Sequence, residues 1–326
     1  MKNIFALVAI MLLVEAPKGF SQKPNGQKGQ FHIFQSDRNG FNAKTIFYDD
    51  GKEIVAFGAL FNNRYAQQAI DFVRKSSKNP IKWLVALDPS PEQINGIDSF
   101  RKAGAKVIMS KLTIKNLPDN HAFSKDYYIN ISKIFTDSSY PKLPKADITF
   151  DDNYTLKLAN GSKIILTELK QSAGANNQTI AYFPNDTVLV VGDLINHNSH
   201  LWLEGPIVKG KYIYNNDNWI KALRTLESKN YPPSSLVYGA HGYEAILAEA
   251  VPQQISYLQK AEKTVRQYLL SLKGNTAKEK LAYVDYALLT KLFLHTFPAY
   301  DFDYKIKYGL HGMVEEVLAS MYQEGK

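Results

Sequence analysis

The chain has 326 residues, of which 45% are hydrophobic and 12% aromatic, enough for a large buried core. The formal charge is +8, but the lysines are scattered and no basic run alternates with aromatic residues. This pattern favours a solvated basic surface over nucleic-acid binding. No cysteine is present, which excludes disulfides, thiolate nucleophiles and cysteine-ligated zinc.

Residues 1–21 have the pattern of a secretory signal peptide. Lys2 gives a short basic start, and residues 4–14 (IFALVAIMLLV) form an apolar run too short to span a bilayer. Small residues precede the expected cut after Ser21. The polar Gly/Pro-rich stretch 22–30 predicts a disordered leader. Together these features predict a bacterial protein in the periplasm or outside the cell, with no transmembrane segment after cleavage.

The first third predicts a hairpin followed by alternating helices and strands. The expected elements are strands 45–48 and 53–57 around the turn Asp49-Asp50-Gly51, helix 63–75, strand 81–87, helix 94–103 and strand 105–109. This order predicts a mixed sheet covered by helices. Residues 111–144 are rich in Tyr, Ser and Lys, and we expect loops there with at most one short helix.

The middle of the chain is rich in β-structure and the end is helical. The expected elements are hairpins around Asn160-Gly161 and around 184–186, helix 218–228, strand 236–238, and three helices after residue 251. Thr276 and Glu279 form a capping box for the second of these helices, which we expect to run to about Thr296. We therefore divide the mature chain into a domain over 31–250 and a helical extension over 251–326. The extension is expected to pack on the core, and a homodimer surface is the alternative.

The strand 81–87 (IKWLVAL) leads into the loop LDPSPEQINGI, which is an unusual connector. It holds the carboxylates Asp88 and Glu92 together with Ser90 and Gln93, between two prolines. A loop at the carboxyl end of a buried strand is a frequent seat of chemistry. The alternative is structural, because Asp88 and Glu92 could cap the helix that follows.

The order of the segments PIKWLVAL, NGIDSFRKAGAKVIMSK, IAYFPNDTVLVVGDLI and VYGAHG resembles the metallo-β-lactamase fold superfamily. The resemblance covers about residues 41–242, and PNDTVLVVGDLI is its most specific part. It implies an α/β (α+β) fold, a four-layer αββα sandwich, with a zinc site at one edge of two sheets. Fold alone does not imply function.

The resemblance implies a ligand motif that this chain has largely replaced. A typical member carries His-x-His-x-Asp-His after the apolar strand. In chain order, the family's ligand positions fall on Asp88, Ser90, Glu92, Gln93, Gly174, Asp193 and His241. Of these, only Asp193 and His241 keep the family's residue type. The resemblance also implies that His200, in the loop after Asp193, lines the cleft, although a lone loop histidine is more often a surface residue.

The donor chemistry argues against a two-zinc site. Serine and glutamine are weak neutral ligands, and glycine offers no side chain. Two readings remain for the other four positions. Asp88, Glu92, Asp193 and His241 could hold one hard cation such as Mg²⁺, Ca²⁺ or Mn²⁺, or they could be hydrogen-bonding remnants of a vacated cleft lined by Ser90, Gln93, Gly174 and His200.

The sequence therefore predicts an exported protein of this fold that is non-catalytic or binds an unknown small molecule in the vestigial cleft. The alternative is a hydrolase of an ester, lactone, amide or phosphoester with a single unconventional metal ion, in which Asp88, Asp193 and His241 would be catalytic. A Ser90–His241–Asp88 nucleophile set is a weaker third idea. The expected cofactor is accordingly none or one divalent metal ion. A further hypothesis, from a different functional class, is an interaction protein that dimerises or docks through its C-terminal helices.

Overall fold

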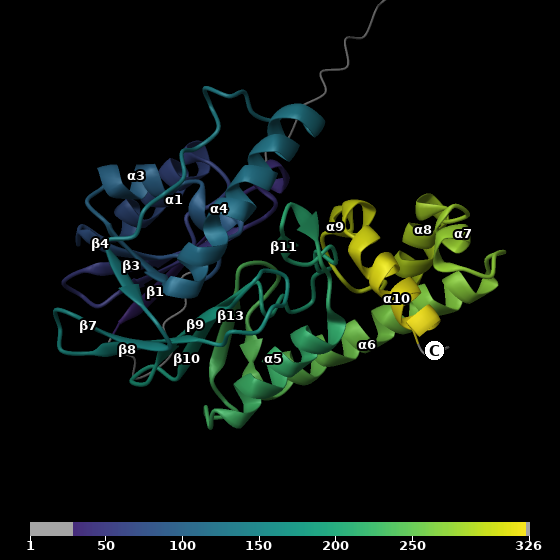
Figure 1. Ribbon diagram of the computed structural model, residues 1–326. Coiled ribbons are helices and arrows are strands. Elements are labelled where there is room, and N and C mark those ends of the chain that lie inside the picture. Colours follow the sequence, from purple (N-terminus) through teal and green to yellow (C-terminus); the bar gives the residue numbers. More distant parts are fainter. Residues whose placement is uncertain (1–28, 324–326) are drawn as a thin grey trace, which may run out of the picture.

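The computed structural model describes residues 29–323, which form two stacked six-stranded sheets with helices on their outer faces (Figure 1). This αββα arrangement confirms the predicted fold class. The predicted signal peptide and residues 22–28 of the leader lie outside the described residues. Strand β1 begins at Gln30, the last residue of the predicted leader.

The first sheet has the order β1-β2-β3-β4-β5-β6. Its strands are β1 (Gln30–Gln35), β2 (Lys44–Asp49), β3 (Ile54–Phe57), β4 (Ile81–Val85), β5 (Lys106–Ser110) and β6 (Ile148–Phe150). The pairs β1–β2 and β2–β3 are antiparallel, which confirms the predicted hairpin, and β3 to β6 run parallel. Parallel strands end at the same edge, so the loop after β4 lies where a site is expected.

The second sheet has the order β14-β13-β10-β9-β8-β7. Its strands are β7 (Asn153–Lys157), β8 (Lys163–Glu168), β9 (Thr179–Phe183), β10 (Val188–Gly192), β13 (Leu236–Gly239) and β14 (Ala245–Ile246). The antiparallel pairs β7–β8 and β9–β10 confirm the two hairpins predicted from their turn residues. A small separate ribbon pairs β11 (Ile207–Val208) with β12 (Lys211–Tyr212).

The core between the sheets follows from the two-residue period of the strands. In β2, Ile46 and Tyr48 point between the sheets, whereas Phe47 points outward to the helices. Tyr48 meets Phe183 of the second sheet with ring centroids 4.8 Å apart, and Phe31 of β1 meets Phe183 at 5.0 Å. Each such aromatic pair adds about 1 kcal/mol beyond its buried area, which fixes one sheet on the other.

Helices cover the outer face of each sheet (Figure 1). The first sheet carries α1 (Asn63–Ser76), α2 (Pro91–Ile94) and α3 (Ile97–Lys102), preceded by a single 3₁₀ turn (Arg38–Gly40). The second carries α5 (Asn216–Ser228) and α6 (Leu247–Ser271). The predicted helix 94–103 is wrong in one respect, because it is broken at residues 95–96. A Cβ at Gly96 would lie 2.0 Å from the Ala59 carbonyl oxygen, so the chain passes too closely there for one continuous helix.

The prediction of loops with at most one short helix over 111–144 was wrong for residues 111–131, whereas residues 132–144 contain no helix or strand. The segment begins with the 16-residue helix α4 (Lys111–Asp126), which continues into a π-helical turn (Tyr127–Ile131). Its buried positions, Thr113, Leu117, Asn120 and Ser124, have helical spacing but are mostly polar, so hydrophobic periodicity did not reveal them. Ser110 begins the helix, because its side chain accepts a hydrogen bond from the Thr113 N–H at 2.9 Å.

The C-terminal helices pack on the second sheet and not only on each other. One hydrophobic cluster contains Ile180 and Leu189 of that sheet together with Leu258, Phe293 and Val314 of the extension. The predicted capping box is confirmed, but it begins only α7 (Ala277–Leu281). A separate helix follows, and the remaining elements are α8 (Tyr286–Thr296), α9 (Tyr304–Tyr308) and α10 (His311–Gln323). Across residues 29–323, no helix is both long enough and apolar enough to cross a bilayer.

Candidate functional site

A cavity of about 100 Å³ opens at the edge where the loops of both sheets meet the C-terminal extension. Its polar wall contains Glu92, Asp193, His241 and Lys305. The rest of the wall is rich in aromatic side chains, namely Phe41, Phe123, Tyr127, Tyr128, Trp202, Tyr212, Trp219 and Tyr304. An apolar pocket with a few converging polar groups is the usual form of a small-molecule site.

Asp88 does not line this cavity, although it lies just beneath it. Its side chain is 0% exposed, and Oδ1 accepts a hydrogen bond from the Ser90 N–H at 2.8 Å. Oδ2 has no hydrogen-bond partner within the described part of the chain. Burial and then the negative charge of Asp193 raise the pKa of Asp88 well above its usual range. Asp88 is thus a buried acid that shapes the loop, not an open ligand.

The other predicted loop residues divide between the cavity and its support. Ser90 and Glu92 line the cavity. Gln93 does not, which corrects the prediction that it belongs to the pocket. It is buried, and its Oε1 accepts a hydrogen bond from the Leu87 N–H at 3.2 Å, so it holds the loop against β4. Burial and the charge of Asp193 raise the pKa of Glu92 to about 7.

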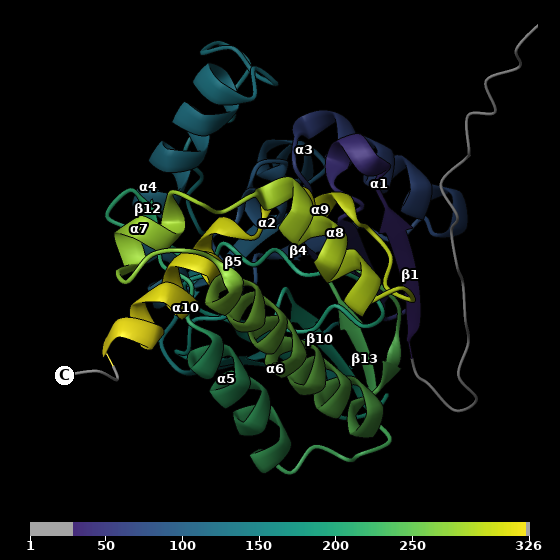
Figure 2. The same cartoon turned by 90° about the vertical axis from the view of Figure 1, so that its right-hand side faces the viewer.

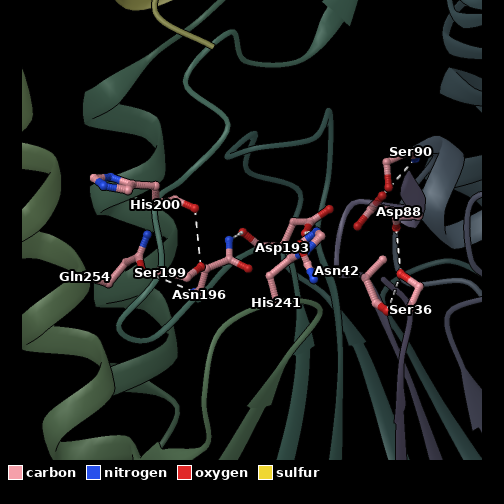
Figure 3. A network of polar contacts seen from close by, with 12 residues as sticks. Ser36, Asn42, Asp88, Ser90, Asp193, Asn196, Ser199, His200, His241 and Gln254 are labelled. Carbon is pink, nitrogen blue, oxygen red and sulfur yellow. Dashed lines mark hydrogen bonds and ion pairs between the residues drawn. The ribbon is translucent and has the colours of Figure 1, made fainter. Parts of the chain in front are cut away.

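Asp193 and His241 come together on the cavity wall, as Figure 3 shows. The distance from His241 Nε2 to Asp193 Oδ1 is 3.5 Å. Burial, followed by the positive charges of Lys305 and Lys44, lowers the pKa of His241 well below its usual value. Burial raises the pKa of Asp193, and the charge of Lys305 opposes that shift. These shifts favour the neutral form of His241, in which its contact with Asp193 is not an ion pair.

Gly174 lies where the resemblance places a ligand, beside Asp193. A Cβ at this position would lie 3.6 Å from Asp193 Cβ and 3.2 Å from Cη2 of Trp219. Trp219 is buried in the core, donates from Nε1 to the Leu194 carbonyl at 2.9 Å, and presents its ring edge to the cavity. This edge covers the floor beneath Gly174, so an indole ring lines the place where the family's histidine is expected.

The structure also corrects the prediction for His200. It was predicted to line the cleft, but it is 0% exposed and lies toward α6, away from Asp193 (Figure 3). Its Nδ1 is 2.9 Å from the Tyr257 hydroxyl, and the rings of Phe293, Phe297 and Tyr300 surround it. Burial lowers the pKa of His200 to about 4, so it serves as a neutral core residue that joins the loop after β10 to the extension.

The donor set does not fit the zinc ions that the resemblance implies. Within residues 29–323, no group of three or more His, Asp or Glu side chains is placed to hold a metal ion. Asp88 is covered by its own loop, Gly174 offers no donor, and only Asp193 and His241 are in contact. A zinc site needs at least three such donors converging on one point.

Two lysines near the site were missed by the sequence analysis. Lys305 of α9 lines the cavity with 3% of its surface exposed, and burial lowers its pKa to about 8. Lys44, the first residue of β2, donates a hydrogen bond to the Gly242 carbonyl, and burial also lowers its pKa to about 8. No motif surrounds either lysine. Trp202 also lines the cavity, whereas Tyr238 packs between the sheets.

Comparison with solved structures finds the same architecture in metallo-β-lactamases. The metallo-beta-lactamase from Pontibacter korlensis matches with a TM-score of 0.54 and 16% identity, over 74% of this chain and 99% of that one. TMB-1 matches at 0.53 and 15%, and DIM-1, a metallo-beta-lactamase exposed to ceftazidime, at 0.53 and 16%, each over 76% of this chain and 99% of its own. Neither the protein-family models nor the curated proteins provide a match.

The chain therefore has the metallo-β-lactamase fold, as the segments PNDTVLVVGDLI and VYGAHG indicated. Identities of 15 and 16% establish the fold and nothing finer. What distinguishes this chain is the edge of the sandwich, where the predicted ligand positions lack a convergent set of metal donors.

Proposed function

We propose that this is an exported protein of the metallo-β-lactamase fold that binds a small molecule in the cavity at the sheet edge and is not a zinc hydrolase. The observation that carries the proposal is the donor set, in which Gly174 and the buried Asp88 leave only Asp193 and His241 in contact. A hydroxide nucleophile needs a metal ion with an open coordination position, and two donors do not hold one.

The cavity wall supports ligand binding. Aromatic side chains from separate parts of the fold, including Phe41, Tyr128, Trp202 and Tyr304, line the cavity beside its polar wall. Rigid rings of this kind provide a large contact area at little cost in side-chain entropy. We therefore expect a ligand with an apolar or aromatic body and a polar end that reaches Glu92, Asp193 and Lys305.

The decisive experiment is elemental analysis of the purified protein, followed by titration with zinc. We expect no stoichiometric metal and no binding at micromolar zinc. A protein that keeps one or two zinc ions per chain through dialysis would contradict the proposal. Native mass spectrometry of the same sample, before and after unfolding, is expected to release a bound small molecule. A Trp202→Ala variant should retain less of it, whereas a variant of the exposed Tyr283 should retain as much.

A metal-dependent hydrolase is the second candidate. The contact between Asp193 and His241 on the cavity wall favours it, because these residues occupy the family's own ligand positions. It requires that Mn²⁺ or Mg²⁺ give an esterase or phosphoesterase activity that an Asp193→Ala, His241→Ala double variant lacks. The positive charge of Lys305 at the same wall argues against this candidate, since it repels a divalent ion.

A homodimer through the C-terminal helices stays a prediction. The apolar faces of α6 and α10 are buried in the core, so they are not a free surface. The extension still exposes several apolar side chains, namely Leu270, Leu281, Tyr283, Leu288 and Leu292. Light scattering on the full mature chain tests the dimer, and N-terminal sequencing of exported protein, expected to begin at Gln22, tests the signal peptide.

A further inference from the structure

The short helix α9 is held over the cavity from two sides. On one side, Asp301 pairs with the loop after β10, because the His200 N–H donates to the Asp301 carbonyl at 2.8 Å. On the other side, the Tyr304 hydroxyl donates to Asn42 Oδ1 at 3.0 Å. Figure 2 shows α9 next to α8, and Tyr304 and Lys305 of α9 line the same cavity as Pro91 and Glu92 of α2. These anchors place Lys305 at the cavity wall from a segment outside the two sheets.

Lys305 lines the same cavity as the acidic side chains Glu92 and Asp193. Its charge acts on Asp193 and Glu92, and the two carboxylates in turn favour the charged form of the lysine. Within residues 29–323, the Lys305 ammonium group forms no ion pair with a carboxylate within 4.0 Å. Lys291 of α8, by contrast, is exposed.

Ionised carboxylates that are buried in a cavity require a nearby positive charge. Glu92 and Asp193 line the same cavity, and their ionised forms repel each other. Burial in a low-dielectric site makes that repulsion costly. In a metal enzyme the metal ions supply the compensating charge. Here the donors do not converge on a metal, and a lysine enters the same wall.

We propose that the Lys305 ammonium is the resident cation of this cleft and neutralises Glu92 and Asp193 in the role that a divalent metal ion would otherwise fill. The inference rests on the proposed function, because it explains why the cleft needs no metal. It also makes the C-terminal extension a part of the site, since α9 delivers the only lysine that lines the cavity within the described residues.

A thermodynamic cycle at pH 7.5 tests this proposal. Lys305→Met keeps most of the aliphatic stem and removes the charge, and it is expected to lower Tm by roughly 6 °C or more, because it leaves buried acids uncompensated. In an Asp193→Asn background the same change should cost clearly less, since one of the acids is already neutral. Lys291→Met, an exposed control on α8, should have the same small effect in both backgrounds.

Equal Tm losses from Lys305→Met in the two backgrounds would overturn the inference. If Lys305→Met alone is insoluble, the double variant decides: recovery of soluble protein supports the proposal, and continued insolubility refutes it. Zinc analysis of the parent keeps the two proposals apart. Stoichiometric zinc would remove the proposed function as well, whereas an additive cycle in zinc-free protein removes only the role of Lys305.

Discussion

Glu168, the last residue of β8, joins three segments around the cavity. Its Oε2 accepts hydrogen bonds from Ser110 Oγ at 2.6 Å, Asn177 Nδ2 at 2.7 Å and Thr179 Oγ1 at 3.0 Å, and its Oε1 accepts one from the Lys170 N–H at 3.0 Å. All four partners donate, which is the arrangement an ionised carboxylate requires. The carboxylate therefore ties the start of α4 to the segment that leads into β9. Asn120 and Phe123 farther along α4, and Gly174 and Ala175 before β9, line the cavity.

The cost of changing Glu168 follows from these contacts. In Glu168→Gln, the amide oxygen can serve the three donors on one side, but its NH₂ group then faces the Lys170 N–H. One donor loses its acceptor and three bonds lose their charge assistance, which together cost about 3 kcal/mol. Glu168→Ala deprives all four donors and leaves a void, so we expect a loss of about 5 kcal/mol.

Urea unfolding of the two variants measures this loss as a shift of the midpoint at an unchanged slope. Glu227→Gln on the exposed face of α5 is the control and should change the free energy of unfolding by less than about 0.5 kcal/mol. A loss below about 1 kcal/mol for Glu168→Gln would refute the reasoning, because it would mean that the four donors find water or other partners without the carboxylate.

Three further predictions concern buried charge and close packing. Burial lowers the pKa of His200 to about 4. The contribution of the neutral side chain to stability is therefore present above pH 6.5, and about 3 kcal/mol of it is lost as the pH falls toward 4. His200→Phe should reduce the difference in Tm between pH 7 and pH 5. Burial raises the pKa of Glu316 to about 7. The contribution of its protonated side chain to the free energy of unfolding is therefore highest below pH 4.5 and falls as the pH rises to 7. Glu316→Gln should raise the free energy of unfolding at pH 8 by about 1 kcal/mol, after allowance for partial exposure, and an unchanged Tm would contradict this. Gly96→Ala should cost about 3 kcal/mol in urea unfolding because its Cβ would meet the Ala59 carbonyl, whereas Gly161→Ala, with open space and only a positive φ, should cost about 1 kcal/mol.

The strands were predictable because their signals are local. Turn residues such as Asn160-Gly161 and apolar runs such as 81–87 define hairpins and buried strands without knowledge of distant contacts. The helix α4 was not predictable in this way, because it buries polar side chains that face the cavity and the Glu168 network. A helix whose buried face is polar has no hydrophobic period to detect.

The candidate site was predictable only in part. Alignment of family segments located Asp193, His241 and Gly174 near one another, and the structure places these three at the cavity. Alignment could not show that Asp88 turns beneath its own loop or that His200 turns toward Tyr257, since both depend on packing that has no local signature.

The charge balance of the cleft illustrates this limit most directly. The motif positions alone describe an acidic site that has lost most of the family's histidines, and that description leaves open both a vacated cleft and a single hard metal ion. Lys305 changes the inference, yet it lies more than sixty residues beyond the last matching segment, on a helix of five residues with no motif around it. It reaches the acids because Asp301 and Tyr304 anchor its segment to two other loops. A replaced metal site is thus defined as much by the charge that enters it from elsewhere in the fold as by the ligands that it has lost.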